Sequence, residues 1–197
     1  APNEIVDRFD PTGVLHGAAE NRGELPKRLL YATSSGIGGT GLDSTSYEGV
    51  RASFEQGFLS EIVCFGHQQK VVPRSLIRSL QMHPVRALSC LGSRDYYPAK
   101  KRYADWIASR RLRSGDFDFF HGWSGDCFRS LIEARMRGIP SVMDIPTWHR
   151  NKGHAKSAET KSEREARLRM GGWRDWRKKL AIPRTQMLAE YDLADVI

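Results

Sequence analysis

A glycine-rich stretch at residues 36–41 constrains the fold of this chain more than any other feature. Four of its six residues are glycine, an apolar run at 29–32 precedes it, and an amphipathic segment at 47–58 follows it. Where a strand is followed by a glycine-rich turn and then a helix, the backbone N–H groups of the first helical turn have no partners inside the helix. The helix dipole adds positive potential at this N-terminus. The stretch therefore predicts a site for negatively charged oxygens after the first strand.

Apolar runs typical of buried strands alternate with segments of helical periodicity along the rest of the chain. Strands are expected at 28–33, 59–65, 85–91, 117–120, 139–145 and 196–197, helices at 47–58, 98–113, 128–138 and 183–191, and a loop with a short helix at 68–84. This alternation predicts an α/β fold, a Rossmann-like doubly wound parallel sheet. Ligands of such sheets bind beyond the carboxyl ends of the strands, so the loops at 36–41, 121–125 and 144–150 are expected to meet.

The length of 197 residues and the apolar content of 40% suit one domain. We expect that domain at 27–197, after a flexible polar arm at 1–26. Three cysteines, Cys64, Cys90 and Cys127, lie in apolar runs and are expected to be buried thiols of a reducing, cytoplasmic compartment. Neither metal-ligand spacing nor a membrane-spanning run is present in the sequence. The missing initiator methionine and an end within an expected strand lead us to expect a piece of a longer protein.

A basic segment at 150–179 carries most of the net charge of +8. It contains eleven Lys or Arg and four Asp or Glu, and a helix is expected within it at about 162–170. The segment is either the solvated face of a helix or a contact for an anionic membrane surface or nucleic acid.

The loops after the expected strands at 117–120 and 139–145 hold the candidate binding residues. His121 is either a structural histidine or a group that donates to a sugar or phosphate oxygen and exchanges protons near neutral pH. Trp123 either faces a sugar ring or fills the core, and Ser124 either contacts a ligand or caps the next helix. His149 either binds a polar substrate or lies in a surface loop.

A dinucleotide site is the first alternative for the glycine-rich stretch. Gly36, Gly38 and Gly41 fit the pattern G-x-G-x-x-G, and Tyr96 with Lys100 imitates the catalytic pair of short-chain dehydrogenases. The strand at 59–65 ends without the acidic residue that holds the ribose. An NAD(P)-dependent oxidoreductase therefore stays the alternative enzyme class, and a basic α/β module for nucleic acid or membranes stays the alternative outside enzymes.

Several motifs, in order, resemble the N-terminal domain of retaining GT-B glycosyltransferases of family 4. Residues 117–123 (FDFFHGW) resemble the family's D-hydrophobic-hydrophobic-H-x-H strand end. Residues 137–144 (RGIPSVMD) resemble its R-G-I-P-x-V strand, and residues 188–197 (LAEYDLADVI) its E-x-x-x-A-D-x-I segment. Together with the glycine-rich stretch, the resemblance covers 27–197.

The resemblance implies an acceptor-binding domain that faces a separate C-terminal donor domain, which this chain lacks. It implies transfer of a sugar from a nucleotide-sugar to a glycan or lipid-linked acceptor, without a metal or other cofactor and with little activity of this domain alone. Gly38, Gly39 and Gly41 would approach the donor phosphate, and His121 would be catalytic. The residues expected to bind the acceptor are Trp123, Ser124, Asp144, Trp148 and His149.

The chain departs from the family pattern at Trp123, where many members carry a second histidine. Family members often build glycans at the inner face of the membrane. The resemblance therefore favours an anionic membrane surface as the partner of the segment 150–179, with Trp173 and Trp176 lying on the bilayer. Nucleic acid is the rival partner.

Overall fold

The computed structural model describes residues 28–82, 84–91, 93–146 and 182–197. The expected arm at 1–26, the basic segment 150–179 with its expected helix, and the candidate residues Trp148 and His149 lie outside this described part. No helix in the described part is both long and apolar enough to cross a membrane.

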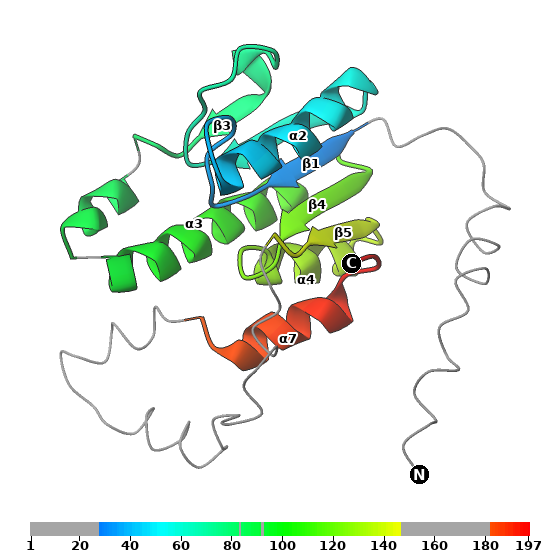
Figure 1. Ribbon diagram of the computed structural model, residues 1–197. Helices are drawn as coiled ribbons and strands as arrows, with labels where there is room; N and C mark the ends of the chain where they lie inside the picture. Colours follow the sequence, from blue (N-terminus) through cyan, green and yellow to red (C-terminus); the bar gives the residue numbers. More distant parts are fainter. Residues whose placement is uncertain (1–27, 83, 92, 147–181) are drawn as a thin grey trace, which may run out of the picture.

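A parallel sheet forms the centre of the domain (Figure 1). Its five strands are β1 (Leu29–Ala32), β2 (Leu59–Cys64), β3 (Ile77–Ser79), β4 (Phe119–Trp123) and β5 (Ser141–Asp144). They are ordered β3-β2-β1-β4-β5, and each pair of neighbours runs parallel. The predicted Rossmann-like α/β fold is confirmed, and the sheet reverses its direction of growth between β1 and β4.

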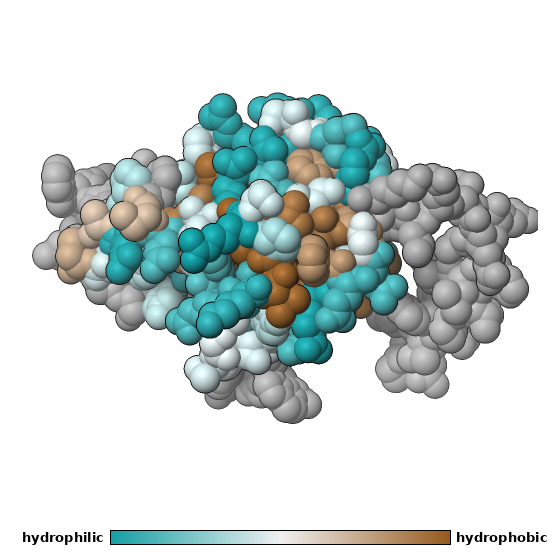
Figure 2. All heavy atoms as spheres, turned by 90° about the horizontal axis from the view of Figure 1, so that it is seen from above, coloured by the Kyte–Doolittle hydropathy of each residue, from teal (hydrophilic) through white to brown (hydrophobic). Residues whose placement is uncertain are grey.

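Helices cover both faces of this sheet (Figure 1). Helix α2 (Leu42–Glu55) packs on one face, while α3 (Ser93–Ser114), α4 (Phe128–Met136) and α7 (Arg184–Leu193) contribute to the core on the other. The residues that α2 buries, Ser46, Val50 and Ser53, recur at helical spacing on one side. Figure 2 views the molecule from above and shows hydrophilic side chains around a smaller apolar area.

The all-apolar first strand is explained by its central position. All four residues of β1 are buried, because Leu29 and Tyr31 face the α2 side while Leu30 and Ala32 face the side of α3 and α4. A strand covered on both faces has no polar side, so its sequence is a continuous apolar run rather than an alternation.

The end of the chain adds a single β-bridge beside β5, where a sixth strand was expected. Val196 pairs in parallel with Val142, and the Met143 N–H donates to the Val196 carbonyl at 2.9 Å. Asp195 fixes this end because its carboxylate accepts hydrogen bonds from the Ser141 N–H at 2.8 Å and the Ser141 hydroxyl at 2.9 Å.

The predicted third strand at 85–91 is wrong. Those residues lie in the 3₁₀-helix η3 (Pro84–Leu91), and the third strand is β3, inside the segment expected to be a loop. Proline suits the first turn of a helix, and the apolar spacing of three residues across 85–91 suits a 3₁₀-helix. The expectation that Cys90 is buried is also wrong, because η3 leaves it exposed, whereas Cys64 and Cys127 are buried as predicted.

Candidate functional site

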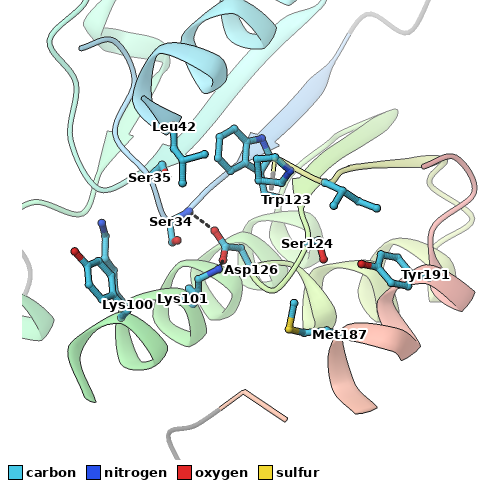
Figure 3. A pocket seen from close by; sticks show the side chains of 13 residues that line it. Ser34, Ser35, Leu42, Lys100, Lys101, Trp123, Ser124, Asp126, Met187 and Tyr191 are labelled. Carbon is cyan, nitrogen blue, oxygen red and sulfur yellow. Dashed lines mark hydrogen bonds and ion pairs between the residues drawn. The ribbon is translucent and has the colours of Figure 1, made fainter. Parts of the chain in front are cut away.

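A pocket of about 170 Å³ opens at the carboxyl ends of β1, β4 and β5 (Figure 3). It lies beside the β1–β4 boundary, where the connections from the two strands leave in opposite directions and a crevice forms. Residues after β1, after β4 and after β5 line it together with α3 and α7. The connections after these three strands do meet here, through residues 34–35, 123–126 and 145–146. The expected stretch 36–41 does not line the pocket, and residues 147–150 lie outside the described part.

Asp126 ties three of these elements together at the pocket wall (Figure 3). Its side chain is almost fully buried, and Oδ2 accepts a hydrogen bond from the Ser34 N–H at 2.8 Å. Its other oxygen, Oδ1, lies 2.6 Å from the Lys101 ammonium on α3. A buried carboxylate is stable only when it is paired and hydrogen-bonded, so Asp126 fixes the positions of the loop after β1 and the start of α3 relative to each other.

Glu190 holds α7 against the connection after β4, which contains both Gly125 and Asp126. It is fully buried, and Oε2 accepts a hydrogen bond from the Gly125 N–H at 2.5 Å, while Oε1 has no hydrogen-bond partner among the described residues. Burial, with the neighbouring charges of Asp105 and Asp126, raises the pKa of Glu190 to about 8. The carboxyl is therefore mostly protonated at neutral pH.

Asp105, a residue of α3, places its carboxylate at the N-terminus of α4. Its carboxylate accepts hydrogen bonds from the Arg129 N–H at 2.8 Å and the Ser130 N–H at 2.9 Å, which are free donors of the first helical turn. Burial raises the pKa of Asp105 to about 6. Because the chain's own carboxylate fills this helix terminus, the terminus is not open to an external anion.

Residues 36–41 do not line the pocket, although Ser35 before them and Leu42 after them do. Gly38, Gly39 and Gly41 all have positive φ, which explains the glycines, but none of them lines the pocket. Asp43 takes up part of the predicted anion-binding capacity, because its carboxylate accepts from the Gly36 N–H at 2.9 Å and its carbonyl from the Gly38 N–H at 2.9 Å. That Gly38, Gly39 and Gly41 approach a donor phosphate stays a prediction.

His121 and Asp144 form a pair on the α2 side of the sheet, and neither lines the pocket. The His121 Nε2 lies 2.8 Å from the Asp144 Oδ2. The Tyr31 ring packs against the imidazole at 4.7 Å between centroids, and the Tyr31 hydroxyl accepts a hydrogen bond from the Trp123 Nε1–H at 2.8 Å. Burial raises the pKa of Tyr31. Trp123 thus links this buried network to the pocket.

Ser124 lines the pocket, as one of its two predicted roles requires. The other role is wrong, because α4 begins at Phe128 and its N-cap residue is Cys127. The Ser124 hydroxyl is buried without a hydrogen-bond partner in the described part of the chain. Helix α2 begins at Leu42, earlier than the expected start at residue 47, and its N-cap residue Gly41 makes no side-chain hydrogen bond.

Sequence reasoning missed most of the charged residues at the site. The pocket and its supporting network also include Ser34, Ser35, Tyr97, Lys100, Lys101, Asp126, Glu190 and Tyr191. For Glu190 a signal existed in the E-x-x-x-A-D-x-I motif, but a buried acidic side chain on a helix cannot be told from an exposed one by its spacing. The described residues contain no cluster of three or more His, Cys, Asp or Glu that would hold a metal ion.

Comparison of the chain with protein-family models, with curated proteins and with solved structures finds no match. The function is therefore argued from the pocket.

Proposed function

We propose that this chain is the acceptor-binding domain of a retaining glycosyltransferase of the GT-B type. The observation that carries the proposal is the composition of the pocket at the β1–β4 boundary. Its walls combine hydroxyl groups and ammonium groups with the aromatic rings of Tyr97, Trp123 and Tyr191. Sugars need both, because their hydroxyls form hydrogen bonds with polar groups while the C–H face of the ring packs on aromatic side chains.

In this proposal the pocket forms one wall of a cleft whose other wall is a C-terminal donor domain. That domain would bind the nucleotide-sugar, and Gly38, Gly39 and Gly41 would approach its phosphates from this side. His121 would offer its Nδ1 to the reacting groups, because its Nε2 is paired with Asp144. The leaving-group charge would be met by backbone amides and basic side chains. The basic segment 150–179 would contact an anionic membrane surface.

A titration followed by ¹⁵N NMR tests the proposal on this chain. We expect neutral and acidic monosaccharides to shift the amide signals of four residues that line the pocket, Ser34, Ser35, Ser124 and Asp126. Millimolar concentrations should be needed, because a lone sugar would contact only one wall of the cleft. Tyr97→Ala should weaken these shifts because the exposed ring of Tyr97 lines the pocket. Trp106→Ala, which removes an aromatic side chain of α3 outside the pocket, should leave them unchanged.

Two outcomes would contradict the proposal. One is micromolar binding of NADPH by this chain, which would favour the oxidoreductase. The other is a set of saccharide-induced shifts that avoids the four pocket amides, or no shifts at all.

A further inference from the structure

Two neighbouring lysines of α3 reach the pocket, and within the described part of the chain one of them has a counter-ion and the other does not. Lys101 is paired with Asp126 at 2.6 Å. The Lys100 ammonium lies 5.0 Å from the centroid of the Phe65 ring, and among the described residues it makes neither an ion pair nor a hydrogen bond. Burial lowers the pKa of Lys100. Its charge therefore lies in a partly desolvated place, and the described residues offer it no hydrogen-bond acceptor.

The two carboxylates whose charges act on Lys100, those of Asp43 and Asp126, are already engaged. Asp126 binds Lys101 and the Ser34 N–H, and Asp43 binds the Gly36 N–H, so both are held in place by other groups. The cation–π contact with Phe65 leaves the ammonium without a hydrogen-bond acceptor among the described residues. Keeping a charge partly buried in this way is costly, and an external anion would offset that cost.

Hydroxyl donors complete the surroundings of Lys100. The side chains of Ser34 and Ser35 line the pocket, and within the described part of the chain their hydroxyls make no hydrogen bond. Ser124 adds a hydroxyl that is buried and also without a partner. Lys100, Lys101 and Asp126 are the charged residues among those that line the pocket, so the lining carries a net charge of +1.

We infer that the acceptor bound in this pocket carries an acidic group, a phosphate or a carboxylate, which pairs with Lys100 and accepts hydrogen bonds from the hydroxyls of Ser34 and Ser35. The inference rests on the proposed function, because it names the chemical class of the acceptor at the same site. A hydrogen-bonded charge pair in such a site contributes more to the binding free energy than a hydrogen bond between neutral groups does. The acidic group would therefore anchor the acceptor while the aromatic walls hold its sugar ring.

The anion has two plausible sources, a sugar acid and a lipid phosphate. The rim of the pocket bears the exposed apolar side chains of Leu42, Tyr97 and Ile145, which are 42%, 55% and 37% exposed. These side chains would contact the chain of a lipid, whereas a sugar acid or sugar phosphate would leave them exposed. The test therefore includes one ligand of each kind.

Four ligands are titrated into the chain by NMR: glucose, glucuronic acid, glucose 6-phosphate and dihexanoyl phosphatidic acid. We expect the acidic ligands to bind about tenfold or more tightly than glucose. Tighter binding of dihexanoyl phosphatidic acid than of glucose 6-phosphate, with shifts at Leu42 and Ile145, would identify a lipid phosphate as the source. Tighter binding of glucose 6-phosphate would identify a sugar acid or sugar phosphate. Either order supports an acidic acceptor.

Lys100→Met and Lys100→Gln should reduce the affinity for acidic ligands to that for glucose, and thermal unfolding would check that both variants fold. The matched control is Lys70→Met, which removes an exposed lysine outside the pocket and should change nothing. Equal affinities for glucose and the acidic sugars, unchanged by Lys100→Met, would overturn this inference and leave the proposed function standing. If the unmodified chain binds none of the saccharides, both this inference and the proposed function are overturned.

Discussion

Replacing Glu190 by glutamine should make the domain more stable above neutral pH, although it alters a fully buried hydrogen-bonded residue. Burial raises the pKa of Glu190 from 4.5 to about 8. The folded state therefore binds the proton more tightly than the unfolded state does. The resulting stabilisation is complete below pH 4.5 and is lost as the pH rises through 8. Glutamine does not titrate, and its carbonyl oxygen can still accept the hydrogen bond from the Gly125 N–H.

The size of the effect follows from the shift. Each pKa unit corresponds to about 1.4 kcal/mol, so the free energy of unfolding contributed by this carboxyl falls by on the order of 5 kcal/mol between pH 4.5 and 8. That is a large part of the stability of an ordinary domain, which is roughly 5–15 kcal/mol. The difference between Glu190→Gln and the unmodified chain should therefore grow steadily with pH and level off above about pH 8.

Urea unfolding at a series of pH values measures this difference. Subtracting the two curves removes the titrating groups that do not interact with Glu190. Asp105 interacts with it, and its pKa of about 6 gives a decline of the same sign at lower pH, so the comparison is read above about pH 7. A difference that stays constant from about pH 7 to 9 would refute the reasoning, because Glu190 would then already be ionised in the folded state at neutral pH. Slower unfolding of the variant at high pH would be a second sign of a more firmly held α7.

Three further substitutions test other parts of the structure. Glu133→Gln should act in the opposite direction, because the pKa of Glu133 is lowered by its hydrogen bond with Arg113: urea midpoints should drop at neutral pH, and the loss should shrink as the pH falls below 4.5. Tyr31→Phe removes the acceptor of the buried Trp123 N–H and should cost about 1–3 kcal/mol in chemical unfolding, whereas a cost near zero would mean that the Trp123 N–H finds another partner. Gly38→Ala should lower the free energy of unfolding by about 1–3 kcal/mol, because φ is 83° and a Cβ would lie 3.0 Å from the Gln69 nitrogen; an unchanged melting temperature would contradict this strained turn.

An element of the fold could be predicted from the local sequence pattern wherever most of its own residues are apolar and buried. Strands β1, β2, β4 and β5 were predicted within a few residues, since each is a short apolar run next to a glycine or a turn. The third strand was missed because β3 is a three-residue edge strand with two exposed positions. Such a strand depends on pairing with β2 rather than on its own apolar content, and the longer apolar segment at 84–91 was the stronger local signal.

The site was predicted only in outline. Strand ends were expected to meet, and Trp123 and Ser124 do line the pocket. The glycines of 36–41 were expected at the ligand, but the Asp43 carboxylate accepts from the Gly36 N–H and none of residues 36–41 lines the pocket. A local hydrogen bond of this kind depends on the turn geometry, which the sequence pattern leaves open.

Taken alone, the amino-acid sequence determined the alternation of strands and helices, and with it the parallel sheet and the edge at which a ligand would bind. The reason is that apolar periodicity acts over a few residues and is written into each segment. Only the tertiary structure decided which charges are paired. Asp126 meets the Ser34 N–H across 92 positions, and Glu190 meets Gly125 across 65. These contacts bury two acidic side chains and leave Lys100 without a counter-ion among the described residues, and such pairings depend on the order of the strands in the sheet.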